Sequence, residues 1–341
     1  MSIELFDPRL DPEPPGWQEF RTGEGLTAIW SYEAIRKASE GTPSPLLLAL
    51  FRHGPTIVGA LTGVYLGLRR PGSVTAPRRR REPIVLDVRL PGEGNEVSWH
   101  FRADVSAEQR RELMREFERA VRHWLGRGLA GIVYRHVTPG EVATVARAGA
   151  VARASVGTAR MPITWKNVDG WLATLGGSRR RNLRRRARLI DADPDLTVES
   201  GTRRTDLDPA LLARMVADQQ RRLQNRIDPR VPLSAGYFAE MVRRDDVSFL
   251  TYTEGSGRLL AFSTLLHHPS WPQLGWWSGL PIEEGGRGHL YFDHYLRTVE
   301  QVIGQGSEGL IAGRGRLEVK RELGFREVPM KLVAVPRWSL G

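Results

Sequence analysis

The chain of 341 residues contains no cysteine. This absence excludes disulfide bonds, a thiolate nucleophile and any metal site that needs cysteine ligands. No apolar run reaches the roughly 18 residues that a membrane-spanning helix needs. The first residues are acidic and rich in proline, and they lack the basic and then apolar order of a secretory signal. Together these absences predict a cytoplasmic protein without a membrane partner.

Lysine is also scarce, because only Lys37, Lys166, Lys320 and Lys331 among the 50 basic residues are lysines. Arginine supplies the others, and the formal net charge is +11. A basic balance of this size points to a nucleic acid or another polyanion as partner. An arginine bias also follows from GC-rich coding, so local clustering is better evidence than the total.

The densest cluster is the segment SRRRNLRRRARL, residues 178–189, which holds seven arginines. Ser178 is a suitable N-cap, and Leu183, Ala187 and Ile190 fall at helical spacing, so a basic helix is predicted over 178–190. Like charges three or four residues apart destabilise a helix by ~0.2–0.5 kcal/mol per pair. The cluster therefore indicates either a polyanion to be neutralised or a solvated basic face.

The order of predicted elements repeats in two halves. In each half a long helix ends at a Gly-x-Gly turn, a strand follows, and a short helix runs to a single glycine. The matched glycines are Gly126, Gly128 and Gly149 in the first half and Gly304, Gly306 and Gly324 in the second. A duplicated α/β domain explains both the pattern and the length, although two α/β halves can also resemble each other by chance. We predict domains at 1–160 and 161–341.

Local signals predict individual elements. Ser106 and Gln109 have capping-box spacing, which indicates that a long helix begins there and runs to about residue 125. Residues 31–39 predict a short helix with a serine cap. Residues 1 to about 25 predict an irregular arm. A second basic run, Arg78 to Arg81, lies between prolines and predicts an exposed loop.

The segment KRELGF, residues 320–325, before a final strand resembles the C-terminal signature of the GNAT acyltransferase fold. The order WKNVDGWLATLGGSRRRNLRRRARL, GRLLAFSTLL and GLIAGRGRLEVKRELGF is similar to the double-GNAT group, which includes the Fem-type peptidoglycan aminoacyltransferases and related natural-product enzymes. The resemblance covers about residues 161–337. It implies tandem GNAT-like α/β domains with mixed sheets, a basic helix between or beside them, and transfer of an acyl group to an amine.

The resemblance implies two possible donors. Simple GNAT enzymes hold acyl-CoA where a glycine-rich turn opens a helix, whereas Fem-like members take an aminoacyl group from tRNA. In the candidate turn, Gly286 and Gly288 match the GNAT pattern, but Glu283 stands where Gln or Arg is expected. Carboxylates beside a pyrophosphate repel it, and phosphate contacts by arginine favour tRNA. The predicted tRNA contacts are Arg179, Arg180, Arg181, Arg184, Arg185 and Arg188 in the helix and Arg78, Arg79 and Arg80 in the loop.

The candidate site residues lie in the second half. By resemblance, Lys320 faces the substrate cleft and contacts anionic or developing negative charge. Glu318 is a candidate proton acceptor for the amine, and the Tyr252 hydroxyl is a candidate acid. Trp276 and Ser278 share one face of the strand before the glycine-rich turn, and Trp277 lies on the other. One of the two tryptophans can stack on the terminal adenine while the other is core, and we take Trp276 and Ser278 as substrate-binding candidates. The other substrate-binding candidates are Arg287, Tyr291, Arg314 and Arg316. Each of these side chains also has an ordinary role in packing or on the surface.

The sequence therefore predicts an aminoacyl-tRNA-dependent aminoacyltransferase that forms an amide bond on a natural-product or cell-wall amine. An aminoacyl ester is already activated, so no cofactor is expected. No metal is expected either, because His267 and His268 lack a third ligand. One alternative is an acyl-CoA-dependent N-acyltransferase. Another is a non-catalytic nucleic-acid-binding protein built on a GNAT scaffold.

Overall fold

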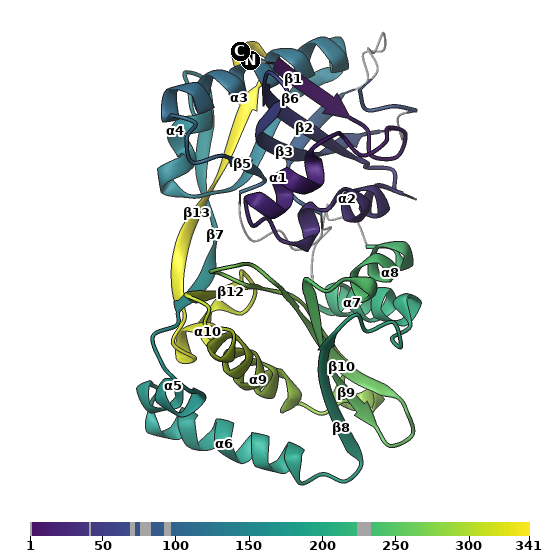
Figure 1. Cartoon of the computed structure of the whole chain (residues 1–341), viewed down its shortest axis with the longest axis vertical. Helices are drawn as coiled ribbons and strands as arrows, with labels where there is room; N and C mark the ends of the chain where they lie inside the picture. Colours follow the sequence, from purple (N-terminus) through teal and green to yellow (C-terminus); the bar gives the residue numbers. More distant parts are fainter. Residues whose placement is uncertain (1, 41, 69–71, 76–82, 92–96, 224–232) are drawn as a thin grey trace. The chain divides into compact units, whose positions relative to one another are not determined.

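Figure 1 shows a computed structural model of the chain, which describes residues 2–40, 42–68, 72–75, 83–91, 97–223 and 233–341. The predicted tRNA contacts Arg78, Arg79 and Arg80 lie outside these described residues. Contacts between residues divide the chain into two compact units. The first consists of Met1–Gly157 and Pro329–Gly341, and the second of Thr158–Val328. Within the described ranges, no helix is long and apolar enough to cross a membrane.

The first unit is built on a mixed sheet. Its strands follow the order β1 (Ser2–Phe6), β2 (Leu46–His53), β3 (Thr56–Gly67), β4 (Ile84–Val88), β6 (Leu129–Val137) and β13 (Arg326–Pro336), and β5 (Trp99–Phe101) pairs with β3. Its helices are α1 (Trp17–Gly23), α2 (Tyr32–Ser39), α3 (Ala107–Leu125) and α4 (Val142–Val145). The pair β4 and β6 is parallel, and the other described pairs are antiparallel.

Two local predictions in this unit have different outcomes. The capping box is confirmed, because the Ser106 side chain accepts from the Gln109 N–H and the Gln109 side chain accepts from the Ser106 N–H. The irregular arm is wrong, because β1 pairs along its whole length with β2. Trp17 and Phe20 of α1 are also buried, so apolar packing organises a segment whose prolines had indicated loop.

The second unit holds the other mixed sheet. Its strands follow the order β7 (Val151–Pro162), β12 (Gly309–Gly313), β11 (Gln273–Gly279), β10 (Leu259–Leu266), β9 (Val247–Glu254) and β8 (Leu196–Thr202). Its helices are α5 (Val168–Thr174), α6 (Gly177–Asp191), α7 (Pro209–Leu223), α8 (Ala235–Arg243), α9 (Leu290–Gly304) and α10 (Leu317–Glu322). Helices α7 and α8 pack on one face of the strands, and α9 packs on the other with α6 against it (Figure 1).

The two halves repeat one order of elements and exchange their last strands. The first half runs α3, β6, α4 and β7, and the second runs α9, β12, α10 and β13. Gly149 lies in the turn that follows α4 and Gly324 directly follows the C-cap of α10, and both have positive φ, at 83° and 89°. However, β7 pairs with β12 in the second unit, whereas β13 pairs with β6 in the first. Residues 329–341 therefore lie in the first unit, while the sequence had placed all of 161–341 in one domain. The predicted α/β class with mixed sheets is confirmed.

Candidate active site

The parallel strands β11 and β12 part soon after they meet. Their register holds one pair, Gln273 with Ile311, near the start of β11. The chain leaves β11 through a short 3-10 turn, Ile282–Glu284, and enters α9 at Leu290. Gly286 is required in this turn, because a Cβ there would lie 1.9 Å from the Leu280 carbonyl oxygen. The glycine-rich turn thus brings the N-terminus of α9 close to the end of β11.

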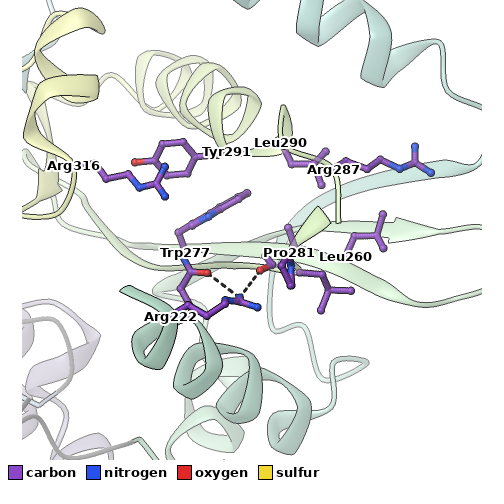
Figure 2. A pocket seen from close by; sticks show the side chains of 13 residues that line it. Arg222, Leu260, Trp277, Pro281, Arg287, Leu290, Tyr291 and Arg316 are labelled. Atoms are coloured by element: carbon purple, nitrogen blue, oxygen red, sulfur yellow. Dashed lines mark hydrogen bonds between the residues drawn. The ribbon is translucent and has the colours of Figure 1, made fainter. Parts of the chain in front are cut away.

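A cavity of about 210 Å³ lies at this N-terminus, within the second unit (Figure 2). Side chains from β10, β11, α7, α9 and the loop before α10 form its walls. The residues used below are Arg222, Leu260, Trp277, Arg287, Tyr291 and Arg316. Three of the substrate-binding candidates, Arg287, Tyr291 and Arg316, therefore come together at one cavity.

One wall of the cavity is aromatic. The Trp277 ring stacks on the buried His294 ring with centroids 4.4 Å apart, and the Tyr291 ring lies 5.5 Å from Trp277. The Arg316 guanidinium carbon lies 4.9 Å from the Tyr291 ring centre, as Figure 2 shows from the side. Burial, with a smaller contribution from the Lys320 charge, lowers the pKa of His294 to about 3, so this ring is neutral near pH 7. The wall offers flat apolar surface beside a positive charge.

The charged side chains of the cavity lining are all cationic. Arg222 donates to the Gly279 carbonyl at 2.8 Å, and Arg287 forms ion pairs with Asp193 and, at 3.2 Å, with Asp195. No carboxylate lines the cavity among the residues that the structure describes, because Glu283 and Glu284 are exposed outside it.

Backbone N–H groups add to the positive character of the cavity. The N–H groups of Arg287, Gly288 and His289 have no acceptor within the described part of the chain. Free N–H groups at a helix start, with the positive end of the helix dipole, attract anions. The cavity thus suits a ligand that combines a flat group with a negative charge.

Two substrate-binding candidates face away from the cavity. The Ser278 hydroxyl donates to the Met215 carbonyl on α7 at 2.7 Å, and Trp276 packs against Tyr237 and Phe238 of α8. Strand alternation puts Trp276 and Ser278 on one face, as expected, but the cavity lies on the opposite face. Trp277 therefore takes the place predicted for Trp276.

The remaining candidates do not line the cavity. Tyr252 is fully buried and its hydroxyl donates to the Asp293 carboxylate at 2.9 Å, and burial raises its pKa far above the ordinary value. Lys320 is 4% exposed and its ammonium donates to the Ala312 carbonyl at the end of β12. Glu318 is exposed on α10, and Arg314 is half-buried. Lys320 thus lies near His294, one layer behind the aromatic wall.

The basic helix forms as α6, but it begins differently from the prediction. Its N-cap is Gly176, and no side chain caps it, so the assignment of Ser178 as cap was wrong. Leu183 and Ile190 are buried as predicted, which fixes the face that packs inward. Four of its arginines, Arg181, Arg184, Arg185 and Arg188, are exposed. Their spacing of three, four and seven residues places them on one face of the helix, and we name them the arginine stripe.

The other arginines of α6 are half-buried and partly engaged within the protein. Arg179 forms an ion pair with Glu322 of α10, and the guanidinium carbons of Arg179 and Arg186 lie 5.4 and 4.1 Å from the Phe292 ring centre. Within the stripe, Arg184 forms an ion pair with Asp169 at 2.6 Å. Arg181, Arg185 and Arg188 have no carboxylate partner within the described residues. The helix therefore presents uncompensated positive charge on its outer face.

The C-terminal end of α6 is tied to the elements of the cavity. Asp191 accepts from Arg297 of α9 at 2.6 Å, and Asp193 and Asp195 bind Arg287, which lines the cavity. Helix α6 thus contacts α9 at Phe292 and at Arg297, and its stripe lies on the element next to the cavity.

Three residues of the site carry no sign of their role in the sequence. Arg222 lies on α7 and Phe292 on α9, and neither residue belongs to a motif. His294 lies beside Asp293, but its place behind Trp277 depends on the helix rotation.

The comparisons with known proteins agree with this fold. Residues 177–321 match a family model described as Acetyltransferase (GNAT) domain. None of the curated protein sequences matches the chain. The structure of L-PGS from Bacillus licheniformis is similar with a TM-score of 0.60 at 11% identity, over 96% of this chain and 93% of that chain. FemX is similar with a TM-score of 0.59 at 10% identity, over 98% and 97% of the two chains. A tandem GNAT protein from the clavulanic acid biosynthesis pathway gives a TM-score of 0.50 at 14% identity, over 98% and 99%.

Residues 177–321 thus match a GNAT acetyltransferase domain, and the chain as a whole shares the fold of tandem GNAT proteins. The matched GNAT domain includes both the arginine helix α6 and the cavity at the start of α9. The two GNAT-like halves correspond to the two runs of helix, strand, short helix and strand described above. The predicted double-GNAT resemblance is thereby confirmed, while the identities of 10 to 14% leave the substrate to be argued from the site.

Proposed function

We propose that this GNAT acyltransferase takes an aminoacyl group from tRNA and forms an amide bond on a small amine, such as a natural-product or cell-wall precursor. One observation carries the proposal. The exposed stripe of Arg181, Arg184, Arg185 and Arg188 lies on α6, and α6 packs against α9 next to a cationic, aromatic cavity. Arginines on a rigid helix neutralise phosphates, and a cavity with a flat wall accepts the terminal nucleoside.

The reaction needs little beyond positioning. The neutral amine attacks the ester carbonyl, the new C–N bond forms, and the C–O bond to the ribose breaks as the proton passes from the amine to the ribose oxygen. The aminoacyl ester is already activated, so no ATP is consumed. What the protein supplies is close approach of the two reactants and donors for the oxyanion of the tetrahedral intermediate.

Individual residues receive the following roles in this proposal. Arg287, Arg316 and the free N–H groups before α9 hold a phosphate, and Trp277 with Tyr291 forms the stacking surface. Lys320 acts from behind the wall, where its charge favours negative charge that develops in the cavity. Glu318, exposed near Arg316 on α10, accepts the proton that an incoming ammonium must lose. Tyr252 positions Asp293, and Arg314 adds positive charge near the end of β12.

A second candidate is transfer from an acyl-CoA. A specific observation favours it, because Glu283 and Glu284 lie outside the cavity lining. The repulsion that the sequence indicated between these carboxylates and a pyrophosphate is therefore smaller than expected. The free N–H groups of Arg287, Gly288 and His289 also suit a pyrophosphate.

A direct assay separates the candidates. The protein is incubated with a pool of amines and either mixed charged tRNA or an acyl-CoA mixture, and the products are identified by mass spectrometry. Amide products that appear with charged tRNA and disappear after RNase treatment support the proposal. Products that form with acyl-CoA alone support the second candidate. Binding of tRNA without any product favours a non-catalytic nucleic-acid-binding protein.

A further inference from the structure

Phe292 and Tyr291 are neighbours in the first turn of α9 and serve different partners. Tyr291 lines the cavity beneath Arg316, whereas Phe292 meets the arginine helix α6. The two rings contact each other edge to face with centroids 5.6 Å apart. One helical turn therefore connects the cavity wall to the helix that carries the arginine stripe.

Two cations of α6 share the Phe292 ring. The Arg186 guanidinium carbon lies 4.1 Å from the ring centre and the Arg179 guanidinium carbon lies 5.4 Å from it. Both arginines are half-buried, and burial lowers the pKa of Arg186, as do the neighbouring charges of Arg179 and Arg185. A cation over an aromatic face gains more when water is partly excluded. This contact is thus a specific attachment between α6 and α9.

The arginines of α6 fall into two groups with different surroundings, one that meets Phe292 and one that faces solvent. Arg179 and Arg186 are seven residues apart, so they project from one side of the helix toward Phe292. The stripe projects into solvent and does not contact Phe292. Loss of the Phe292 ring would therefore leave the stripe available to phosphates while removing one of the contacts that hold α6 on α9, the one nearest the cavity wall.

We propose that Phe292 is a positioning residue that holds α6 on α9 so that an RNA bound along the stripe presents its acyl ester to the cavity. This inference rests on the proposed function with tRNA as donor. Phe292 should strongly affect the rate of transfer from a donor that contacts both α6 and the cavity. It should affect the rate little when the donor reaches only the cavity.

The test compares two donors in the full-length protein. One is a full-length charged tRNA, and the other is the corresponding 3′-O-aminoacyl adenosine, which is too small to reach from the cavity along α6. Phe292→Leu keeps apolar volume and removes the ring face. We expect kcat/KM with charged tRNA to fall about tenfold, because a small misplacement of the reacting ester is costly, and kcat/KM with the adenosine ester to change by less than about twofold. The tRNA Kd should stay within about twofold because the stripe is intact.

Matched variants separate positioning from simple damage to the fold. Phe325 is also buried in this unit and contacts Tyr295 of α9, but among the residues that the structure describes no arginine lies over its ring. Phe325→Leu should lower the rates with both donors by similar factors, and Phe292→Tyr should restore the wild-type ratio. In a chain with Arg181, Arg185 and Arg188 replaced by alanine, Phe292→Leu should cause no further loss with tRNA.

The outcomes distinguish this inference from the function on which it depends. Equal losses with both donors in Phe292→Leu, or no loss with either, overturn the positioning role while the wild-type enzyme still uses tRNA. A wild-type enzyme that uses neither donor overturns the proposed function, and the positioning role with it.

Discussion

The guanidinium carbon of Arg316 lies 4.9 Å from the centre of the Tyr291 ring, and both side chains line the same cavity. Arg316 reaches this place from a left-handed backbone, with φ of 49°, at the residue before α10. Such a conformation is unfavourable for a residue with a Cβ, so the surrounding structure must maintain it. The pair therefore holds a positive charge over an aromatic face at the site where an anionic ligand is expected.

Removing this charge should weaken donor binding. We expect Arg316→Ala to raise the donor KM about tenfold, since a hydrogen bond to a charged group contributes ~1.5–3 kcal/mol. The stability of the fold should change little, because alanine has the same backbone preference as arginine at this position. Arg326→Ala is the matched control, since Arg326 is exposed in the same unit and does not line the cavity. Equal KM values for the two variants would remove Arg316 from the site.

The arginine stripe should determine how RNA binding depends on salt. We expect Arg181, Arg185 and Arg188 replaced together by alanine to weaken tRNA binding and to lower the slope of log K against log salt by about 2–3. The matched control replaces Arg214, Arg243 and Arg326, which are exposed in the same unit on elements other than α6. Both triple variants lose the same net charge. If filter binding gives the same slope for both, the stripe is not the RNA contact.

Replacing Asp169 should change tRNA affinity in the opposite direction to replacing the stripe. Its carboxylate forms an ion pair with Arg184 at 2.6 Å, and both side chains are exposed. Asp169→Asn should release Arg184 to a phosphate, tighten tRNA binding and steepen the salt slope by up to about 1. Asp245→Asn is the control, because Asp245 pairs with Arg203 at a similar exposure elsewhere in the unit. Weaker binding in Asp169→Asn would place the RNA on another surface.

The repeated architecture could be predicted, but the exchange of strands could not. Glycines such as Gly149 and Gly324 mark equivalent turns, because both need a left-handed backbone after a short helical segment. Residue patterns along β7 and β13 show that each segment is a strand. They do not show which sheet accepts it, since pairing depends on long-range contacts. Apolar packing of Trp17 and Phe20 likewise overrode the proline-rich start.

The site could be predicted where it follows local landmarks. Arg287, Tyr291 and Arg316 lie within a few residues of the glycine-rich turn or of the end of β12, and these ends meet in the fold. Trp277 could not be chosen over Trp276, because alternation separates two faces without telling which one the cavity occupies. The inward side chain of Lys320 depends on the packing of α10, which the chain order does not reveal.

The last prediction concerns the pH dependence of stability. His294 is 2% exposed, between the rings of Trp277 at 4.4 Å and Tyr295 at 4.1 Å. Burial lowers its pKa from 6.5 to about 3, with a further contribution from Lys320. Between these values the unfolded chain binds a proton that the folded chain does not bind. The contribution of neutral His294 to stability is therefore complete above pH 6.5 and is lost as the pH falls toward 3.

The variant His294→Phe isolates this effect, because it keeps a flat ring in the stack and cannot take up a proton. Carboxylates titrate in both proteins, so their contributions cancel in the comparison. On moving from pH 7 to pH 5, wild type should lose ~2 kcal/mol more of its free energy of unfolding than the variant does. Urea denaturation at the two pH values measures this difference. A parallel decline in both proteins would mean that His294 is already charged, or is solvated, in the folded state. In that case the aromatic wall of the cavity would be more open to water than the burial of this ring indicates.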